Sequence, residues 1–189
     1  MKHWFSVGVI PYFVAVFLSG FVQMGMFILF QRWLSFSFSG PSFFWRSMLL
    51  QFSLFVPCVF MVAPASFFSS RFPKGKVMAW SSFGMTLTLV AIAVLFGLDI
   101  GWVAFGLMLL YGIFLSIHSP AKLGLLKELF GDRNLVKANA WQSSVAVLGM
   151  VAVSFLTISF TPGEDSPIPY EILPYIFLGL SLCGTIFSF

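Results

Sequence analysis

Charged side chains that could bind an anionic group are concentrated in one stretch of the chain, residues 119–141. This stretch reads SPAKLGLLKELFGDRNLVKANAW and holds six of the sixteen Lys, Arg, Asp and Glu residues of the sequence. They are Lys122, Lys127, Glu128, Asp132, Arg133 and Lys137. A lysine beside an anionic membrane surface gains about 1 kcal/mol. The stretch can therefore either guide a phosphate-bearing head group or hold neighbouring helices at the membrane surface.

The residue types that enzymatic catalysis needs do not have the required spacing. An acyltransferase would need Asp five residues after a histidine, but Gly8 follows His3 and Leu123 follows His118 at that distance. The sequence has neither a cluster of metal-ligating residues nor a glycine-rich phosphate loop of the Walker kind. We therefore expect a protein that is not an enzyme and has no catalytic residue, metal or cofactor. His118 is expected at the membrane interface rather than as a base.

The composition indicates a membrane protein. Hydrophobic residues make up 59% of the chain and charged residues 8%, with a mean hydropathy of +1.00. Soluble domains carry roughly 25% charged residues. Because so few polar side chains cannot coat a water-soluble globule, lipid must be the solvent for most of the surface. The basic residues lie in short segments between apolar runs, which favours membrane lipid and argues against nucleic acid as a partner.

Six uncharged stretches are each long enough to cross a bilayer, which takes about 20 mainly apolar residues. They predict an all-α polytopic membrane protein with six transmembrane helices. The predicted helices cover residues 4–31, 47–70, 77–98, 100–119, 138–161 and 171–189. Gly40-Pro41 and the segment 161–169 carry turn signals and are expected in connections between these helices.

The segment 119–137 is expected to form a short amphipathic helix on the membrane surface, between the fourth and fifth transmembrane helices. Pro120 would end the fourth helix, and Gly131-Asp132 would break the amphipathic one. Its apolar residues fall on one stripe while the charged ones project elsewhere. The stripe consists of Leu123, Leu126, Leu129 and Phe130.

The distribution of basic residues predicts the orientation. With the N-terminus in the cytoplasm, eight of the ten Lys and Arg residues would face the cytoplasm, and the opposite orientation would leave only two there. Cytoplasmic connections of membrane proteins are enriched in Lys and Arg. We therefore expect a multi-pass protein of the cytoplasmic membrane, with its N-terminus and the segment 119–137 in the cytoplasm and the connection 32–46 outside.

The connection APASFFSSRFPKGKV, residues 63–77, resembles the loop between helices 2 and 3 of the major facilitator superfamily of transporters. Arg71, Lys74 and Lys76 match the basic positions of that loop, and Ser70 stands where the family has Asp. The resemblance implies that these basic residues lie in a cytoplasmic gating loop.

The segment 119–140 resembles the loop between helices 4 and 5 of bacterial lysophospholipid transporters, which belong to the same superfamily. They share Ser-Pro-Ala-Lys, a Gly two residues on, an amphipathic piece ending in Glu-Leu, and then Leu-Val-basic-Ala-Asn-Ala. Residues at matching positions include Ser119, Pro120, Lys122, Gly124, Glu128, Lys137 and Asn139. The resemblance implies that these residues also belong to the cytoplasmic gate.

The first predicted helix carries Ser-Gly-Phe-Val-Gln-Met at residues 19–24, where these transporters typically have Gly-Ala-Phe-Asn-Asp-Asn. Phe21 is retained, and the neutral Gln23 replaces an acid. The resemblance implies that Phe21 and Gln23 line a central substrate cavity. A hydrogen bond between helices is the alternative role for Gln23.

Taken together, the resemblance implies that residues 1–189 form the N-terminal six-helix half of a major facilitator fold in a bacterial inner membrane. Such a protein would move lysophospholipid across the membrane by alternating access, together with a C-terminal six-helix half or an acyltransferase domain. Two alternatives remain open. One is a non-transporting half that anchors an acyltransferase, and the other is a major facilitator for a different small solute.

Overall fold

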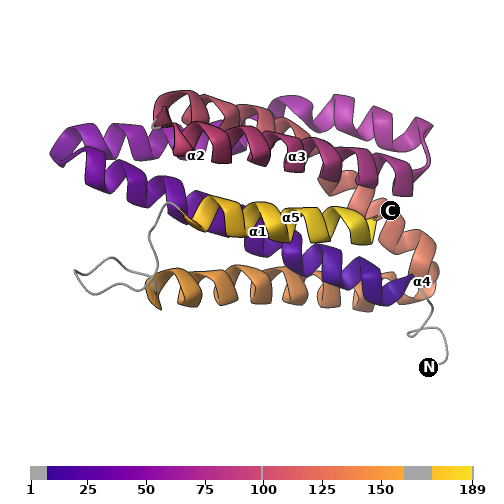
Figure 1. The fold of residues 1–189 in the computed structure, drawn as a ribbon. Helices are drawn as coiled ribbons and strands as arrows, with labels where there is room; N and C mark the ends of the chain where they lie inside the picture. Colours follow the sequence, from indigo (N-terminus) through magenta and orange to yellow (C-terminus); the bar gives the residue numbers. More distant parts are fainter. Residues whose placement is uncertain (1–7, 99, 160–171, 189) are drawn as a thin grey trace.

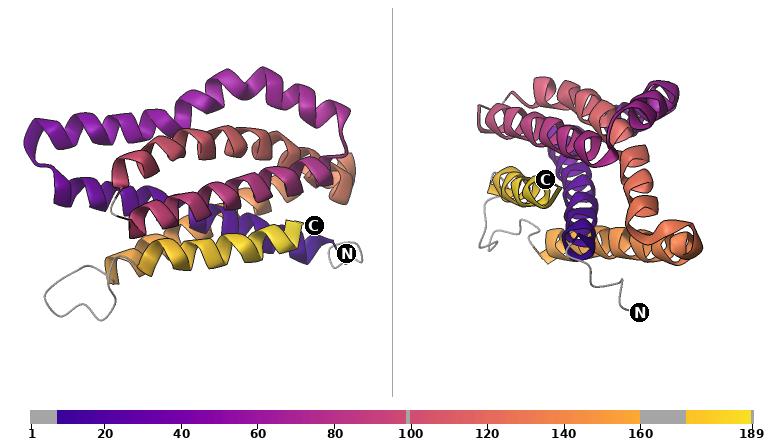
Figure 2. Two further views of the ribbon diagram at one scale, coloured as in Figure 1. Left: turned by 45° about the horizontal axis from the view of Figure 1, so that its top comes forward. Right: turned by 90° about the vertical axis from the view of Figure 1, so that its right-hand side faces the viewer.

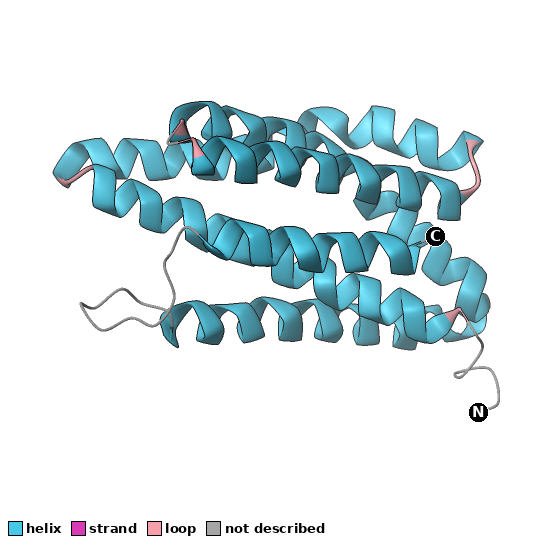
Figure 3. Ribbon diagram, viewed as in Figure 1, coloured by secondary structure: helices cyan, strands magenta, loops and turns pink. Residues whose placement is uncertain are grey.

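The chain is helical throughout the part that the structure describes. The computed structural model describes residues 8–98, 100–159 and 172–188, and five helices fill these ranges (Figure 1). They are α1 (Val9–Ser37), α2 (Gly40–Arg71), α3 (Lys74–Gly97), α4 (Gly101–Ser159) and α5 (Leu173–Ser188). No strand occurs among these residues (Figure 3). The predicted all-α class is therefore confirmed.

Four of the helices, α1 to α4, are long and apolar enough to cross a membrane. The described part of α5 is also apolar but has only 16 residues. Large side chains such as Phe55, Phe60 and Ile186 are exposed on the outside of the bundle. An apolar surface of this kind is typical of a protein embedded in lipid. The predicted connection 161–169 lies outside the described residues. So do residues 4–7 of the first predicted helix, 160–161 of the fifth, and 171 and 189 of the sixth.

The first connection is shorter than the sequence suggested. We expected a loop over residues 32–46, but α1 continues to Ser37 and α2 begins at Gly40. Gly40, with φ 59°, and Pro41 are the first two residues of α2, so they begin a helix instead of lying in the connection. The guanidinium of Arg46 lies 3.4 Å from the ring centre of Phe38, so this charge is accommodated within a helix. The predicted loop over residues 32–46 was therefore wrong.

The expectation that Pro120 ends a helix was also wrong, because α4 continues through it as far as Gly131. A proline inside a helix removes one main-chain hydrogen bond. In the turn before it, Ser116 Oγ and Ser119 Oγ donate hydrogen bonds of 2.6 and 3.1 Å to the main-chain carbonyls four residues earlier. Hydroxyls in such positions often accompany bent helices, and membrane helices tolerate proline. The start of the segment 119–137 is therefore part of a continuous helix.

The break expected at Gly131 is present. Gly131 has φ 68° and ψ 168°, whereas the residues on both sides of it are helical. Figure 2 shows the course of α4: it runs alongside α2 and α3, changes direction and crosses to the other side of α1, and then turns back along the bundle. Residues 101–130 and 132–159 are thus two helical stretches in different parts of the fold.

The core of the bundle is built around α1, which contacts α2, α4 and α5. The larger group of buried side chains includes Phe30, Leu50, Ile92, Met108 and Phe177. A second, smaller group lies where α4 turns back and comprises Tyr12, Ala15, Val16, Met78, Ala121, Leu126 and Ala138. This second core holds the turn of α4 against α1 and α3.

Two glycines allow α1 and the second stretch of α4 to pack closely. A Cβ on Gly20 would lie 2.7 Å from the carbonyl oxygen of Ala146, and one on Gly149 would lie 2.5 Å from that of Phe17. These distances are too short for any other side chain, and the obstructing atoms belong to the main chain. Small residues at helix interfaces favour association in lipid through close packing.

Replacing Gly149 with alanine should separate the two helices. We expect Gly149→Ala to lower the stability of the protein in detergent by about 1–3 kcal/mol, the usual cost of overpacking. The measurement is reversible unfolding followed by circular dichroism. Gly106→Ala is the matched control, since no atom lies within 4 Å of a Cβ at that position in α4. Equal stability of the two variants would contradict the close contact.

The conformation of Gly131 should be equally sensitive. Its φ and ψ fall in a region that is almost restricted to glycine, so Gly131→Ala should cost about 1–3 kcal/mol although no neighbour obstructs a Cβ. Gly179→Ala in α5, which also meets no neighbour, should cost nothing comparable. Unfolding of both variants in the same detergent tests this, and a Gly131→Ala protein as stable as the original would show that the bend does not need this conformation.

Candidate functional site

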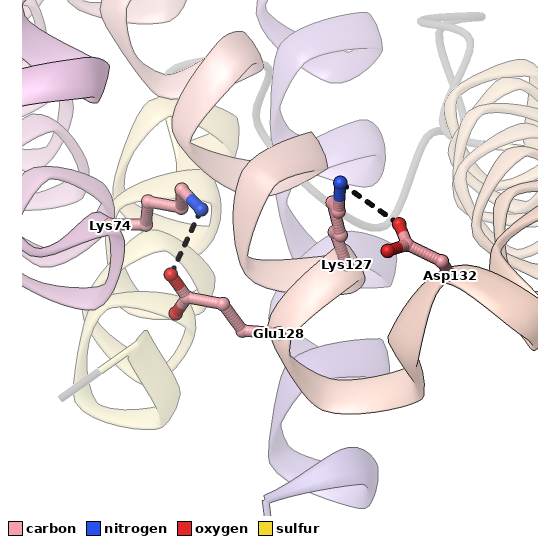
Figure 4. Close-up of polar contacts among 4 residues, drawn as sticks. All are labelled: Lys74, Lys127, Glu128 and Asp132. Carbon is pink, nitrogen blue, oxygen red and sulfur yellow. Dashed lines mark ion pairs between the residues drawn. The ribbon is translucent and has the colours of Figure 1, made fainter.

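The two connections that the sequence singled out, 63–77 and 119–140, meet at the end of the bundle where α4 turns back. Lys74, the first residue of α3, places its Nζ 2.9 Å from Glu128 Oε1 of α4 (Figure 4). Gly124 leaves space for the lysine, because a Cβ there would lie 2.6 Å from Lys74 Cδ. Three of the predicted residues, from two segments far apart in sequence, thus form one contact.

A second ion pair lies at the break in α4. Lys127 Nζ is 2.9 Å from Asp132 Oδ1, so the pair spans Gly131 (Figure 4). Both side chains are largely exposed, at 56% and 79%, and an exposed pair of this kind contributes little to stability. The predicted gating residue Arg71 makes a different contact, with its guanidinium 4.3 Å from the ring centre of Phe67. Arg71 lies in the last turn of α2.

On the inner side of this region, Tyr12 connects α1 to both stretches of α4. Its hydroxyl oxygen lies 2.6 Å from Gln142 Oε1 and 3.2 Å from the carbonyl oxygen of Lys122, and it can donate its proton to either. The Lys122 side chain is half-buried and makes no ion pair with another described residue. An ammonium group without a counter-ion in apolar surroundings is costly, and such groups commonly have a binding role.

His118 is buried inside the bundle, so the expectation of an interfacial histidine was wrong. It is 2% exposed, because α4 does not end at Pro120 and its preceding turn remains in the core. Its Nδ1 lies 3.2 Å from Ser81 Oγ and 3.4 Å from Ser82 Oγ, while its Nε2 has no hydrogen-bond partner among the described residues. A cavity of about 20 Å³ adjoins this ring, room for about one water molecule.

A row of hydroxyls that the sequence reasoning missed joins α3 to α5. Thr86 Oγ1 lies 2.7 Å from Ser181 Oγ and 2.8 Å from Thr185 Oγ1. One turn earlier on α3, Ser82 Oγ donates a 3.4 Å hydrogen bond to Ser188 Oγ. The signal was present in the sequence, since hydroxyl residues at four-residue spacing on two apolar helices favour hydrogen bonds between them.

A groove of about 390 Å³ lies between α2 and α4. Its last lining residue on α4 is Leu123, which precedes Glu128 of the ion pair with Lys74 by little more than one helical turn. Its polar lining comes from Ser66, Ser116 and Ser119, and the remainder is Cys58, Val62, Ala65, Pro120 and Leu123. Both family-like segments therefore contribute to one groove. Leu123 is 48% exposed here instead of packing with the predicted apolar stripe, whereas Leu126, Leu129 and Phe130 do belong to the second core.

The residues predicted to line a central cavity lie further along α1. Phe21 is buried, with its ring centre 6.3 Å from that of Phe177 in α5. Gln23 is half-buried and makes no hydrogen bond with another described residue. Their cavity role stays a prediction. Lys137 and Asn139 are exposed on the second stretch of α4, and their gating role also stays a prediction.

Within the described ranges, no group of three or more His, Cys, Asp or Glu side chains is placed to hold a metal ion. No family model matches this chain, and neither a curated protein nor a solved structure does. The site itself and the resemblance of the two segments that form it are therefore the observations that bear on function.

The Lys74–Glu128 ion pair should contribute only modestly to stability. Its side chains are 30% and 53% exposed, and pairs of this exposure contribute about 0.2–1 kcal/mol. A double-mutant cycle with Lys74→Gln and Glu128→Gln, measured by unfolding in detergent, should give a coupling energy in that range. The more exposed Lys127–Asp132 pair, tested with Lys127→Gln and Asp132→Asn, should give less. A coupling above about 2 kcal/mol for the first pair would contradict this.

Proposed function

We propose that this chain is one half of a major facilitator transporter that moves lysophospholipid across a bacterial cytoplasmic membrane. In this proposal α4 counts as two membrane helices separated at Gly131, which with α1, α2, α3 and α5 makes a six-helix half. A second six-helix half, on the same or another chain, completes the path. The N-terminus and the turn of α4 face the cytoplasm, where the basic residues would be favoured.

The groove between α2 and α4 is the observation that carries this proposal. Ser119 and Pro120, from the segment that resembles lysophospholipid transporters, line it together with Ser66 from the other family-like segment. Its volume of about 390 Å³ lies within the usual range for small-molecule sites. The two segments were matched to the family independently, and they converge on the same space.

The chemistry of the groove suits an amphiphile with one acyl chain. Cys58, Val62 and Leu123 offer an apolar wall, and the hydroxyls of Ser66 and Ser119 offer hydrogen bonds to a glycerol or phosphate oxygen. The lining contains no charged side chain, so a hydrophilic ion or sugar would gain little from it. This favours a lipid over the alternative of another small solute.

The Lys74–Glu128 ion pair supplies a contact that can open and close. It joins the first turn of α3 to the turn region of α4, close to the membrane surface in the proposed orientation. In the proposed mechanism, the pair forms in one state of the alternating-access cycle and separates in another. Lys122, which has no ion-pair partner among the described residues, would attract the phosphate of the arriving head group.

A flip assay in proteoliposomes tests the proposal. The protein, with whatever second half its native gene encodes, is reconstituted and supplied with fluorescent lysophosphatidylethanolamine in one leaflet. We expect transfer to the other leaflet above the rate of protein-free liposomes. Ser66→Trp should fill the groove and reduce the rate by about tenfold or more, as steric changes in apolar pockets commonly do.

Ser70→Trp is the matched control. Ser70 lies one turn beyond Ser66 on α2, is exposed, and does not line the groove. It should therefore transport at the original rate. Absence of lysophospholipid transfer by the unsubstituted protein would refute the function, and an undiminished rate in Ser66→Trp would refute the groove as the path.

A further inference from the structure

A second groove, of about 430 Å³, lies between the end of α2, the start of α3 and the first stretch of α4. Its lining is almost entirely apolar and aromatic. The residues that shape it are Phe68, Phe72, Lys76, Val77, Trp80 and Phe114. None of its lining residues is shared with the groove between α2 and α4, so the two are separate surfaces.

Lys76 gives this groove one positively charged end. The two neighbouring cations are engaged elsewhere, since Lys74 pairs with Glu128 and Arg71 lies over the ring of Phe67. Lys76 is exposed and forms no ion pair with another described residue. The groove contains no acidic side chain to balance it. Lys76 is therefore available to an anionic group that enters the groove.

The groove also has the polarity gradient of a lipid. Lys76 lies in the first turn of α3, at the end of the bundle where α2 and α3 connect (Figure 1). Trp80 follows it by four residues and so lies on the same face, 67% exposed. One turn further along α3, the ring of Phe114 from α4 lies against Gly84. A basic residue, then a tryptophan, then an apolar wall is the order found from the head-group level into the hydrocarbon.

We propose that this groove binds an anionic diacyl glycerophospholipid of the surrounding membrane, with its phosphate at Lys76 and one acyl chain along Trp80 and Phe114. Basic pockets between membrane helices are known to hold anionic head groups. The bound lipid stays in place and links the α2–α3 connection to α4. The inference requires only that the protein is embedded in a membrane, and it stands whether or not the protein transports lysophospholipid.

Quenching of Trp80 fluorescence by brominated lipids tests this site. The protein is placed in nanodiscs of zwitterionic lipid containing a small fraction of either phosphatidylglycerol or phosphatidylcholine with brominated acyl chains. The chain has six tryptophans, so the signal of Trp80 is the difference between the original protein and Trp80→Phe. We expect half-maximal quenching at about a fivefold lower fraction of the anionic lipid, the gain expected from one lysine.

Three variants test whether the positive charge of Lys76 causes the preference for the anionic lipid. Lys76→Gln should abolish the preference for phosphatidylglycerol, and Lys76→Arg should retain it. Lys137→Gln removes the same charge from an exposed position outside the groove and should leave the preference unchanged. Equal quenching by both lipids in the original protein would overturn the proposal. So would an equal loss of preference in Lys76→Gln and Lys137→Gln, since that would reflect only the net charge of the protein.

Discussion

Hydrogen bonding of the main chain in lipid is the constraint on which this structure depends. A helix satisfies its own N–H and C=O groups, whereas a break exposes several of them, and hydrocarbon offers no partners. The chain interrupts α4 at Gly131, in the middle of its most charged stretch, where Lys127, Asp132 and Arg133 are exposed. Charge is therefore concentrated where a long helix has to reverse and its free main-chain groups need a polar environment.

The reversal of α4 also determines which residues can act together. Before the break, residues of α4 contact different neighbouring helices. Ser119 lines the groove with α2, and the main-chain carbonyl of Lys122 accepts a hydrogen bond from the hydroxyl of Tyr12 in α1. Further along, Glu128 reaches Lys74 of α3. If α4 had ended at Pro120, these contacts would have come from a separate short helix. Instead they are held at fixed angles by one continuous helix.

Part of this arrangement was predictable from the sequence, namely the parts that depend on local rules. The helical class follows from long apolar runs, and the break follows from Gly131, which needs no partner elsewhere in the chain. Pro120 was misjudged because a proline can lie inside a membrane helix, and whether it does is decided by packing against neighbouring helices. The wrong expectation for His118 followed from that error. Pairings such as Lys74 with Glu128 could not be predicted. Most of these helices carry apolar residues on all sides, so the periodicity does not indicate which face points inward.

The contacts differ in strength in a way that suits the proposed role as a transporter half. Gly20 and Gly149 bring main chains of α1 and α4 together, and the hydroxyls of Thr86 and Thr185 join α3 to α5. These contacts are buried and cannot separate without unpacking a core, so the helices they join would move as one body. The Lys74–Glu128 ion pair is partly exposed, and separating it costs about 1 kcal/mol or less. That cost changes an equilibrium only about fivefold, so the ion pair could be broken and remade in each cycle of the proposed transporter. A latch that contributed several kcal/mol would instead hold the proposed transporter in one state.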